Sequence, residues 1–171
     1  MTLILIDIVA YYAAWAGAAI GAAHNRPDLA AAACLAALVP HLVSSADRTR
    51  SLALMAVGLG IGLLVESVLA AAGATAFKSQ DLGPWLPPLW SLLLWMSFAT
   101  LLPRALVILQ ARPLLGAVLA ALAAPLAYHA GSEIGALTVL EPYTRSLVLI
   151  ALAWGIAMPI LLLAARRLAH A

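Results

Sequence analysis

The sequence predicts an all-α protein, a polytopic bundle of about six transmembrane helices. Two observations predict this fold class. First, 65% of the 171 residues are hydrophobic and only 9% are charged, whereas soluble domains carry about 25% charged residues. Second, the apolar residues form runs long enough to cross a bilayer, with short polar breaks between them. A water-soluble fold of this size has too little interior for so much apolar surface, which a bilayer can accept.

The expected membrane spans follow one another closely, so the whole chain, 1–171, is interpreted as a single integral membrane domain. The first span is interpreted as retained rather than as a signal peptide, because no basic segment precedes it and Asp7 interrupts its apolar core. Residues 131–140 are less apolar, and we expect them to extend the fifth helix or to form a short interfacial helix. The six spans are expected at residues 2–23, 29–46, 51–74, 88–110, 113–130 and 146–165.

Small residues recur along two of the spans. Gly17 and Gly21 form a GxxxG pair in the first span, which allows two helix backbones to approach closely. In the third span, Gly58, Gly62 and Glu66 fall on one stripe of the predicted helix. Because a charge facing lipid is costly, we expect this carboxylate to face other helices.

Three of the five tryptophans occur within Gly83–Phe98, which begins as a proline-rich turn and continues as the fourth span. Proline suits the first turn of a helix, because the N–H that it lacks has no partner there. We expect Trp85 and Trp90 at the membrane interface, where tryptophan is favoured. Trp90, Ser97 and Arg104 are spaced by seven residues, which predicts that they share an inward face of one continuous helix.

The basic residues indicate how the bundle is oriented. Six spans place both termini on one side of the membrane, and more basic residues flank that side than the other. The first group is Arg48, Arg50, Arg112, Arg166 and Arg167, and the second is Arg26, Lys78 and Arg145. The excess predicts cytoplasmic termini. Because the positive charges are scattered, no basic patch suggests a nucleic-acid partner.

Three ionisable residues are expected to form a charge cluster near the cytoplasmic end of the bundle. Asp7, His41 and Arg104 each lie five or six residues inside that end, roughly 8–9 Å deep at the rise of an α-helix. A charge inside the membrane normally has a partner or a task. We therefore expect an Asp7–Arg104 ion pair with His41 nearby. The pair could fix the packing of the helices, or it could serve as a proton relay or a headgroup site.

A second polar set is expected in the opposite half of the bundle. Its members share a depth on the third, fourth and fifth spans, with Glu66 roughly 12 Å from the outer surface. A hydrogen-bonded core, a substrate or lipid pocket and a metal site are the alternatives for this set. The set comprises Glu66, Trp90, Trp95, Tyr128, His129 and Glu133.

No stretch of the sequence carries a recognised catalytic or cofactor motif. HExxH, GxSxG, the P-loop, the dinucleotide fingerprint and aspartate-rich prenyl-transfer motifs do not occur. His129 and Glu133 are spaced by four residues, but a metal site needs more ligands than these two. We therefore expect no metal and no cofactor, and a non-enzymatic role is favoured.

Several short stretches resemble a known family. Pro87–Trp90 followed by Trp95, the stretch Pro125–Gly131, and the acidic Glu66 in a glycine-bearing span are similar to features of a family of small bacterial inner-membrane proteins of unknown function. Proteins of that family resemble ones encoded beside fatty-acid cyclopropanation-type methyltransferases. The resemblance therefore implies a lipid-related role.

Two classes of function are predicted, and a third is possible. One is an accessory or lipid-binding membrane protein that supports modification of phospholipid acyl chains, with membrane lipids as its partners. It predicts a pocket near Trp90, Trp95 and Glu66 that opens sideways to lipid. The other is a small transporter or permease subunit, which predicts a polar path between the two sets and a homo-oligomer. An intramembrane enzyme would need two of these groups within reach of one substrate.

Overall fold

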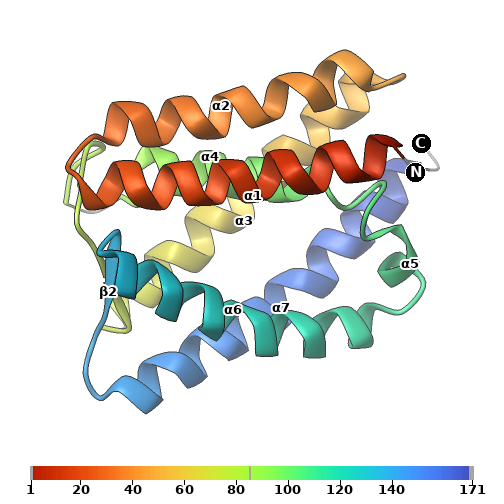
Figure 1. Ribbon diagram of the computed structural model, residues 1–171. Helices are drawn as coiled ribbons and strands as arrows, with labels where there is room; N and C mark the ends of the chain where they lie inside the picture. The colour runs from red at the N-terminus through yellow and green to blue at the C-terminus, as the bar shows by residue number, and fades with distance from the viewer. Residues whose placement is uncertain (1, 85, 170–171) are drawn as a thin grey trace.

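The computed structural model describes residues 2–84 and 86–169, and in this part of the chain the fold is the predicted all-α polytopic bundle. Short turns connect the helices, and two brief strands pair at one end of the molecule (Figure 1). In chain order the elements are α1 (Thr2–Ala23), α2 (Pro27–Ser44), α3 (Arg48–Ala71), β1 (Thr75–Phe77), α4 (Leu89–Ala99), α5 (Val107–Gln110), α6 (Pro113–Ile134), β2 (Leu137–Val139) and α7 (Tyr143–Ala169).

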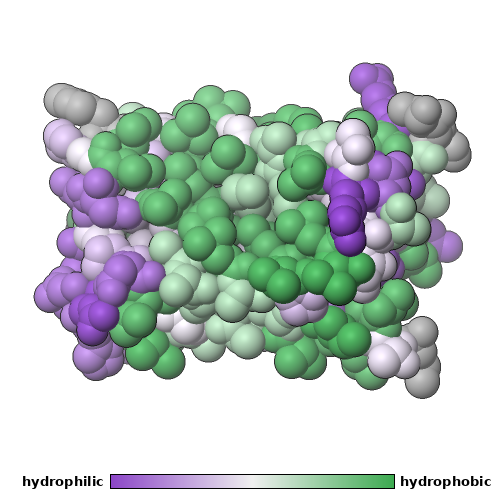
Figure 2. Space-filling view, turned by 90° about the horizontal axis from the view of Figure 1, so that it is seen from above, coloured by the Kyte–Doolittle hydropathy of each residue, from purple (hydrophilic) through white to green (hydrophobic). Residues whose placement is uncertain are grey.

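The chain runs back and forth between two ends of the bundle (Figure 1). We call the end where α1 begins and α7 ends the terminal end, and the end that carries β1 and β2 the sheet end. Five helices, α1, α2, α3, α6 and α7, are long and apolar enough to cross a membrane. Seen from above, apolar residues cover the middle of the molecule and hydrophilic residues gather at its two ends (Figure 2). This distribution is that of a multi-pass membrane protein.

Local signals set most of the helix boundaries. Pro27 and Pro113 occupy the first turns of α2 and α6, where a missing N–H costs nothing. The side chain of Asp47 accepts a hydrogen bond from the backbone N–H of Arg50 at 2.9 Å and caps α3. Gly135 ends α6 with a φ of 87°, a conformation that glycine adopts without strain. The observed ends of α2, α3, α6 and α7 lie within four residues of those expected.

The expectation of a continuous fourth helix over 88–110 was wrong. Helix α4 ends at Ala99, turns occupy 100–106, and α5 is a single short turn. Pro103 has no N–H to continue an α-helical ladder, so the carbonyl of Ala99 instead accepts from the N–H of Leu102 at 3.2 Å. The side-chain amide of Gln110 donates to the carbonyl of Leu102 at 2.8 Å. Trp90 and Ser97 are both buried on α4, but Arg104 lies beyond the helix and does not continue their face.

Residues 131–140 also differ in part from what was expected. The helix α6 does extend to Ile134, but the rest forms β2 rather than an interfacial helix. The strand β2 pairs antiparallel with β1, so that Thr75 lies opposite Val139. This pairing satisfies backbone groups of both connections at the sheet end, where Ala136, Leu137 and Val139 are buried in the hydrophobic cores of the bundle. Trp85, expected at the membrane interface, lies outside the described residues.

Helix α4 packs against three longer helices, α1, α2 and α3. The helices α1 and α2 pack along each other, as do α6 and α7, while α3 packs against both α4 and α7. Trp95 on α4 belongs to the core formed with α3, α6 and α7, whereas Trp90 and Leu93 belong to the core formed with α1 and α2. The helices α1 and α6 touch at only a few residues, so the two halves of the bundle stay apart on this side.

Candidate functional site

Donors from two helices surround the carboxylate of Glu66, which α3 places in the middle of the bundle. Its Oε1 accepts hydrogen bonds from Trp95 Nε1 at 2.9 Å, from Tyr128 Oη at 2.7 Å and from Ser91 Oγ at 3.4 Å. Trp95 and Ser91 lie on α4, and Tyr128 lies on α6. Tyr128 Oη in turn accepts from Trp154 Nε1 of α7 at 3.4 Å. The network therefore ties four helices together through two oxygen atoms, Glu66 Oε1 and Tyr128 Oη.

The second oxygen of the same carboxylate has no partner. Glu66 is only 3% exposed, and its Oε2 is buried without a hydrogen bond among the described residues. Within that part of the chain, no Lys, Arg or His side chain forms an ion pair with Glu66. A buried carboxylate without a cation is costly in a protein interior and more so inside a membrane. Such groups occur most often where a ligand or a proton is handled.

Two glycines of α3 allow α4 to bring Trp95 up to this carboxylate. A Cβ atom at Gly62 would lie 2.3 Å from Trp95 Cγ, and one at Gly58 would lie 2.8 Å from the carbonyl oxygen of Trp95. Glycine is therefore required for this close approach of the two helices. The glycine–carboxylate stripe that the sequence indicated faces α4, as expected of a stripe that avoids lipid.

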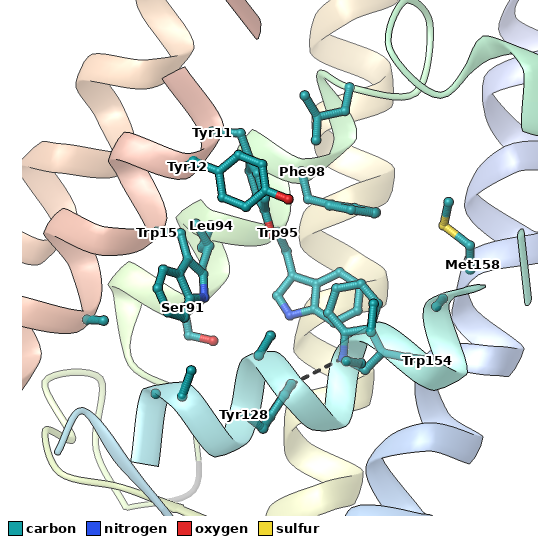
Figure 3. Close-up of a pocket in the computed structure, with 18 of the residues that line it drawn as sticks. Tyr11, Tyr12, Trp15, Ser91, Leu94, Trp95, Phe98, Tyr128, Trp154 and Met158 are labelled. Atoms are coloured by element: carbon teal, nitrogen blue, oxygen red, sulfur yellow. Dashed lines mark hydrogen bonds between the residues drawn. The ribbon is translucent and has the colours of Figure 1, made fainter. Parts of the chain in front are cut away.

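A cavity of about 510 Å³ lies next to Glu66. Its volume is within the range of pockets that hold small-molecule ligands. The chain has five Trp, four Tyr and two Phe, and nine of these eleven line the cavity. Figure 3 shows aromatic side chains from α1, α4, α6 and α7 gathered around it. The nine are Tyr11, Tyr12, Trp15, Phe77, Trp90, Trp95, Phe98, Tyr128 and Trp154.

The aromatic rings are packed against one another in defined geometries. Trp95 and Trp154 stack with their centroids 4.2 Å apart and an interplanar angle of 22°. Phe98 meets Trp154 edge to face at 5.4 Å and Tyr11 edge to face at 5.7 Å. Such pairs stabilise each other beyond the area that they bury. The rings that line the cavity are therefore held in place by their contacts with one another in the core of the bundle.

The cavity opens between α1 and α6. Small residues of α6, such as Ala123 and Ala127, line it and are also exposed on the surface of the bundle. On the opposite side Tyr12 of α1 lines the cavity while remaining 65% exposed. The opening therefore lies between two helices that are both long and apolar enough to cross a membrane.

The residues expected at the cytoplasmic end form a compact ion-pair cluster. Arg104 Nη1 donates to Asp7 Oδ2 at 3.1 Å, and His41 Nδ1 lies 3.2 Å from Asp7 Oδ1. Arg104 also donates to the hydroxyl and the backbone carbonyl of Ser44, at 3.1 and 3.0 Å. The cluster ties α1, the end of α2 and the turns after α4 together at the terminal end.

The predicted outer set divides into two groups. Glu66, Trp90, Trp95 and Tyr128 all line the cavity. His129 points away from it and lies 2.6 Å from the hydroxyl of Tyr143, while Glu133 is exposed on α6; neither lines the cavity.

The depth argument that grouped the outer set could not show which side of α6 faces inward. It also missed Ser91, Tyr11, Trp15 and Trp154, all of which line the cavity. The one signal that could have found Trp154 is its position deep within an apolar span, where tryptophan is unusual.

In the described part of the chain, no three His, Cys, Asp or Glu side chains are arranged to hold a metal ion.

Comparison with known proteins gives a family but no activity. No curated protein and no solved structure matches the chain. Residues 4–160 match the family described as "Protein of unknown function (DUF2878)". Because this match covers nearly the whole chain, the protein belongs to the DUF2878 family, as the resemblance to a membrane family of unknown function predicted.

Proposed function

We propose that the protein binds a hydrophobic ligand taken from the bilayer, with its chain in the cavity between α1 and α6. The observation that carries this proposal is the concentration of nine aromatic side chains around one cavity that opens on the apolar middle of the bundle. A cavity with such walls favours the burial of apolar groups.

The ligand enters sideways, from the lipid phase. The helices α1 and α6 make few contacts with each other, so a chain can pass between them without breaking a packed helix pair. The small side chains of Ala123 and Ala127 leave the opening wide on the α6 side. Membrane lipids are therefore the partners of the protein, and the cavity shields part of one lipid molecule from the surrounding bilayer.

Such a binding site suits an accessory role in the modification of membrane lipids by another enzyme. The resemblance to proteins encoded beside fatty-acid methyltransferases supports this role. The lining of the cavity supports a binding function, because its polar groups are few and its only carboxylate among the described residues is Glu66.

A small transporter is the alternative class, and it requires a polar path between the two halves of the bundle. Asp7, His41 and Arg104 do not line the cavity. The residues that extend the cavity toward the terminal end are apolar, among them Leu101 and Leu106. These features favour ligand binding over transport.

We further propose that the protein resides in a bacterial inner membrane with the terminal end in the cytoplasm. Five arginines flank the terminal end, which the positive-inside rule places in the cytoplasm. The basic residues at the sheet end are engaged locally: Lys78 donates to the carbonyl of Ala23 at 2.6 Å, and Arg145 donates to that of Ala72 at 3.1 Å. Each thereby satisfies a carbonyl at the end of a helix. At Arg26, the hydrogen bonds that the guanidinium donates to the carboxylate of Asp28 raise the pKa of the guanidinium.

The binding proposal is tested by filling the cavity. Phospholipids with brominated acyl chains are added to the purified protein in a nonionic detergent, and quenching of the tryptophan emission is measured. Trp95 is 3% exposed to the surface, so efficient quenching of its emission requires a chain inside the cavity. We expect saturable quenching of the wild type, and we expect Ala123→Phe to weaken it because the larger ring occupies the ligand's volume.

The matched control is Leu122→Phe, which places the same ring on the adjacent position. Leu122 is 65% exposed, and it does not line the cavity. It should therefore leave the saturable quenching unchanged. Equal quenching in all three proteins would show that the signal comes from lipid on the outer surface, and the proposal would then be wrong.

A further inference from the structure

We propose that the ligand is an amphiphilic cation, whose amine or quaternary ammonium group lies between Glu66 and the stacked rings of Trp95 and Trp154. This inference rests on the function proposed above and names the chemical class of the ligand. It rests on two features: Glu66, which is the one ionisable side chain of the lining and has an oxygen that no donor uses, and the aromatic rings beside it.

The charge of the lining favours a cation. Among the described residues that line the cavity, Glu66 is the one Asp, Glu, Lys, Arg or His side chain. The ligand therefore meets a single negative charge and no positive one. A fatty-acid carboxylate or a phosphate group near Glu66 would be repelled, and the low dielectric of the site strengthens this repulsion.

The hydrogen bonds of Glu66 leave one acceptor for the ligand. Oε1 is saturated by donors from Ser91, Trp95 and Tyr128, which hold the carboxylate in a fixed position. Oε2 has no partner among the described residues and is itself buried, so a cation reaches it by displacing the side chains that cover it. Because an unpaired carboxylate is costly at this depth, a cation that pairs with it gains more than a neutral group of the same size.

The aromatic rings beside Glu66 also attract a cation. The face of an aromatic ring carries partial negative charge and attracts cations, tryptophan most strongly. Trp95 and Trp154 stack on each other at 4.2 Å, so each of these rings has at most one face left for a cation. Tyr11 and Trp15 line the facing wall on α1 (Figure 3). A cage of aromatic rings with one carboxylate is a known way to recognise quaternary ammonium groups.

A neutral acyl chain could use the same apolar walls, but it would leave Glu66 unpaired. A cation with an attached hydrophobic chain uses both parts of the site, because its head pairs with Glu66 while its chain extends toward the opening between α1 and α6. The preference for a charged head is therefore the property that separates this inference from hydrophobic binding in general.

The test compares three amphiphiles of equal chain length, each brominated at the end of the chain. Their head groups are trimethylammonium, hydroxyl and carboxylate. Binding to the wild type in nonionic micelles is measured by quenching of tryptophan emission. We expect the trimethylammonium compound to bind roughly tenfold more tightly than the alcohol, a difference of about 1.4 kcal/mol. The carboxylate should bind most weakly.

Two variants show whether Glu66 causes the preference. Glu66→Gln keeps an oxygen for the three donors but removes the charge, so it should bind the cation and the alcohol with nearly equal affinity. Glu133→Gln removes the same charge from an exposed site on α6 and should keep the wild-type preference. Each amphiphile partitions into the micelles to the same extent whichever protein is present. Partitioning therefore cancels when the ratio of the cation affinity to the alcohol affinity is compared between the three proteins.

The possible results separate the two proposals. If the wild type binds the alcohol or the carboxylate as tightly as the cation, the inference is overturned while the cavity remains a hydrophobic site. A cation preference that persists in Glu66→Gln also overturns it. If none of the three amphiphiles quenches the wild type in a saturable way, the proposed function fails as well. Because the first comparison uses only the wild type, a variant that folds poorly does not prevent the test.

Discussion

Glu66 and Asp7 are both buried carboxylates, but their surroundings are opposite. Asp7 faces the guanidinium of Arg104 and the imidazole of His41, so its charge is paired within the protein. Glu66 faces only neutral donors, all on one oxygen. A paired charge inside a membrane protein is typical of a structural contact, whereas an unpaired one indicates a site that acts on something else. We therefore propose that the two clusters have different roles.

The structural role of Asp7 is tested by Asp7→Asn. The amide keeps the shape of the side chain but leaves Arg104 and His41 without a charged partner. Removing one member of a buried ion pair costs about 3 kcal/mol. We expect the free energy of unfolding in mixed micelles to fall by that amount, while binding at the distant cavity changes little.

The matched control is Asp28→Asn, which breaks the ion pair between Arg26 and Asp28. Both of these side chains are more than half exposed, so their pair contributes little. If Asp7→Asn were no more destabilising than Asp28→Asn, the cluster at the terminal end would not hold the helices together.

Helix α4 supplies two of the three donors to Glu66, although it is much shorter than the five helices that are long enough to cross a membrane. Its 11 residues extend only about 16 Å, half of what a membrane span needs. The chain completes the crossing through the turns at 100–106. Irregular backbone at this depth is tolerated where it is buried in protein or lines a cavity. Both conditions are met here, because Leu102 is fully buried and Leu101 and Leu106 line the cavity.

The contact between α3 and α4 is tested by Gly62→Ala. Because a Cβ at Gly62 would lie 2.3 Å from the ring of Trp95, the ring has to move away from Glu66 and from Trp154. We expect a loss of 1–3 kcal/mol of stability, on the order found for overpacked interiors, and a reduced near-ultraviolet circular dichroism signal from the stacked tryptophans.

Gly60 provides the control on the same helix. A Cβ there meets nothing within 4 Å, so Gly60→Ala should leave both the stability and the tryptophan signal close to those of the wild type, or raise the stability slightly. Equal effects of the two substitutions would mean that helix propensity, and not the approach of Trp95, explains the result.

For the whole molecule, the arrangement makes a clear prediction about sidedness. The helices α1 and α7 reach the terminal end, and the connection between β1 and α4 lies at the sheet end (Figure 1). A fluorescent protein fused after the last residue should fluoresce in the cytoplasm of a bacterial host. Alkaline phosphatase inserted after Asp81 should be active, because the enzyme folds only outside the cytoplasm. Activity of both reporters on the same side would contradict the six-pass arrangement.

The two polar sets show how far depth along the chain can predict contacts. Counting residues from the membrane surface placed Asp7, His41 and Arg104 at one depth, and the structure brings them together. The same counting grouped Glu66 with Trp95 and Tyr128, which also meet. It failed where rotation about the helix axis mattered, as at His129 and Glu133 on α6.

The broken fourth segment shows a different limit. Pro103 was visible in the sequence, but proline within a membrane helix often produces only a kink. Whether the chain kinks or unwinds depends on partners for the freed backbone groups. Here Gln110 supplies one such partner from eight residues further along. The strand β2 was missed for a related reason, because its pairing partner β1 is distant in sequence.

The order of residues along the chain was sufficient to establish a multi-pass helical bundle, the approximate bounds of most helices and the shared depth of Asp7, His41 and Arg104. These properties depend on the length and apolar character of single segments compared with the thickness of a bilayer. The cavity and its single carboxylate depend on how helices far apart in sequence cross. Those crossings follow from close contacts such as Gly62 against Trp95, and from the separation of α1 and α6. Contacts of this kind join residues that are far apart in the sequence. The tertiary structure was therefore needed to reveal a cavity that is lined by nine aromatic side chains and Glu66.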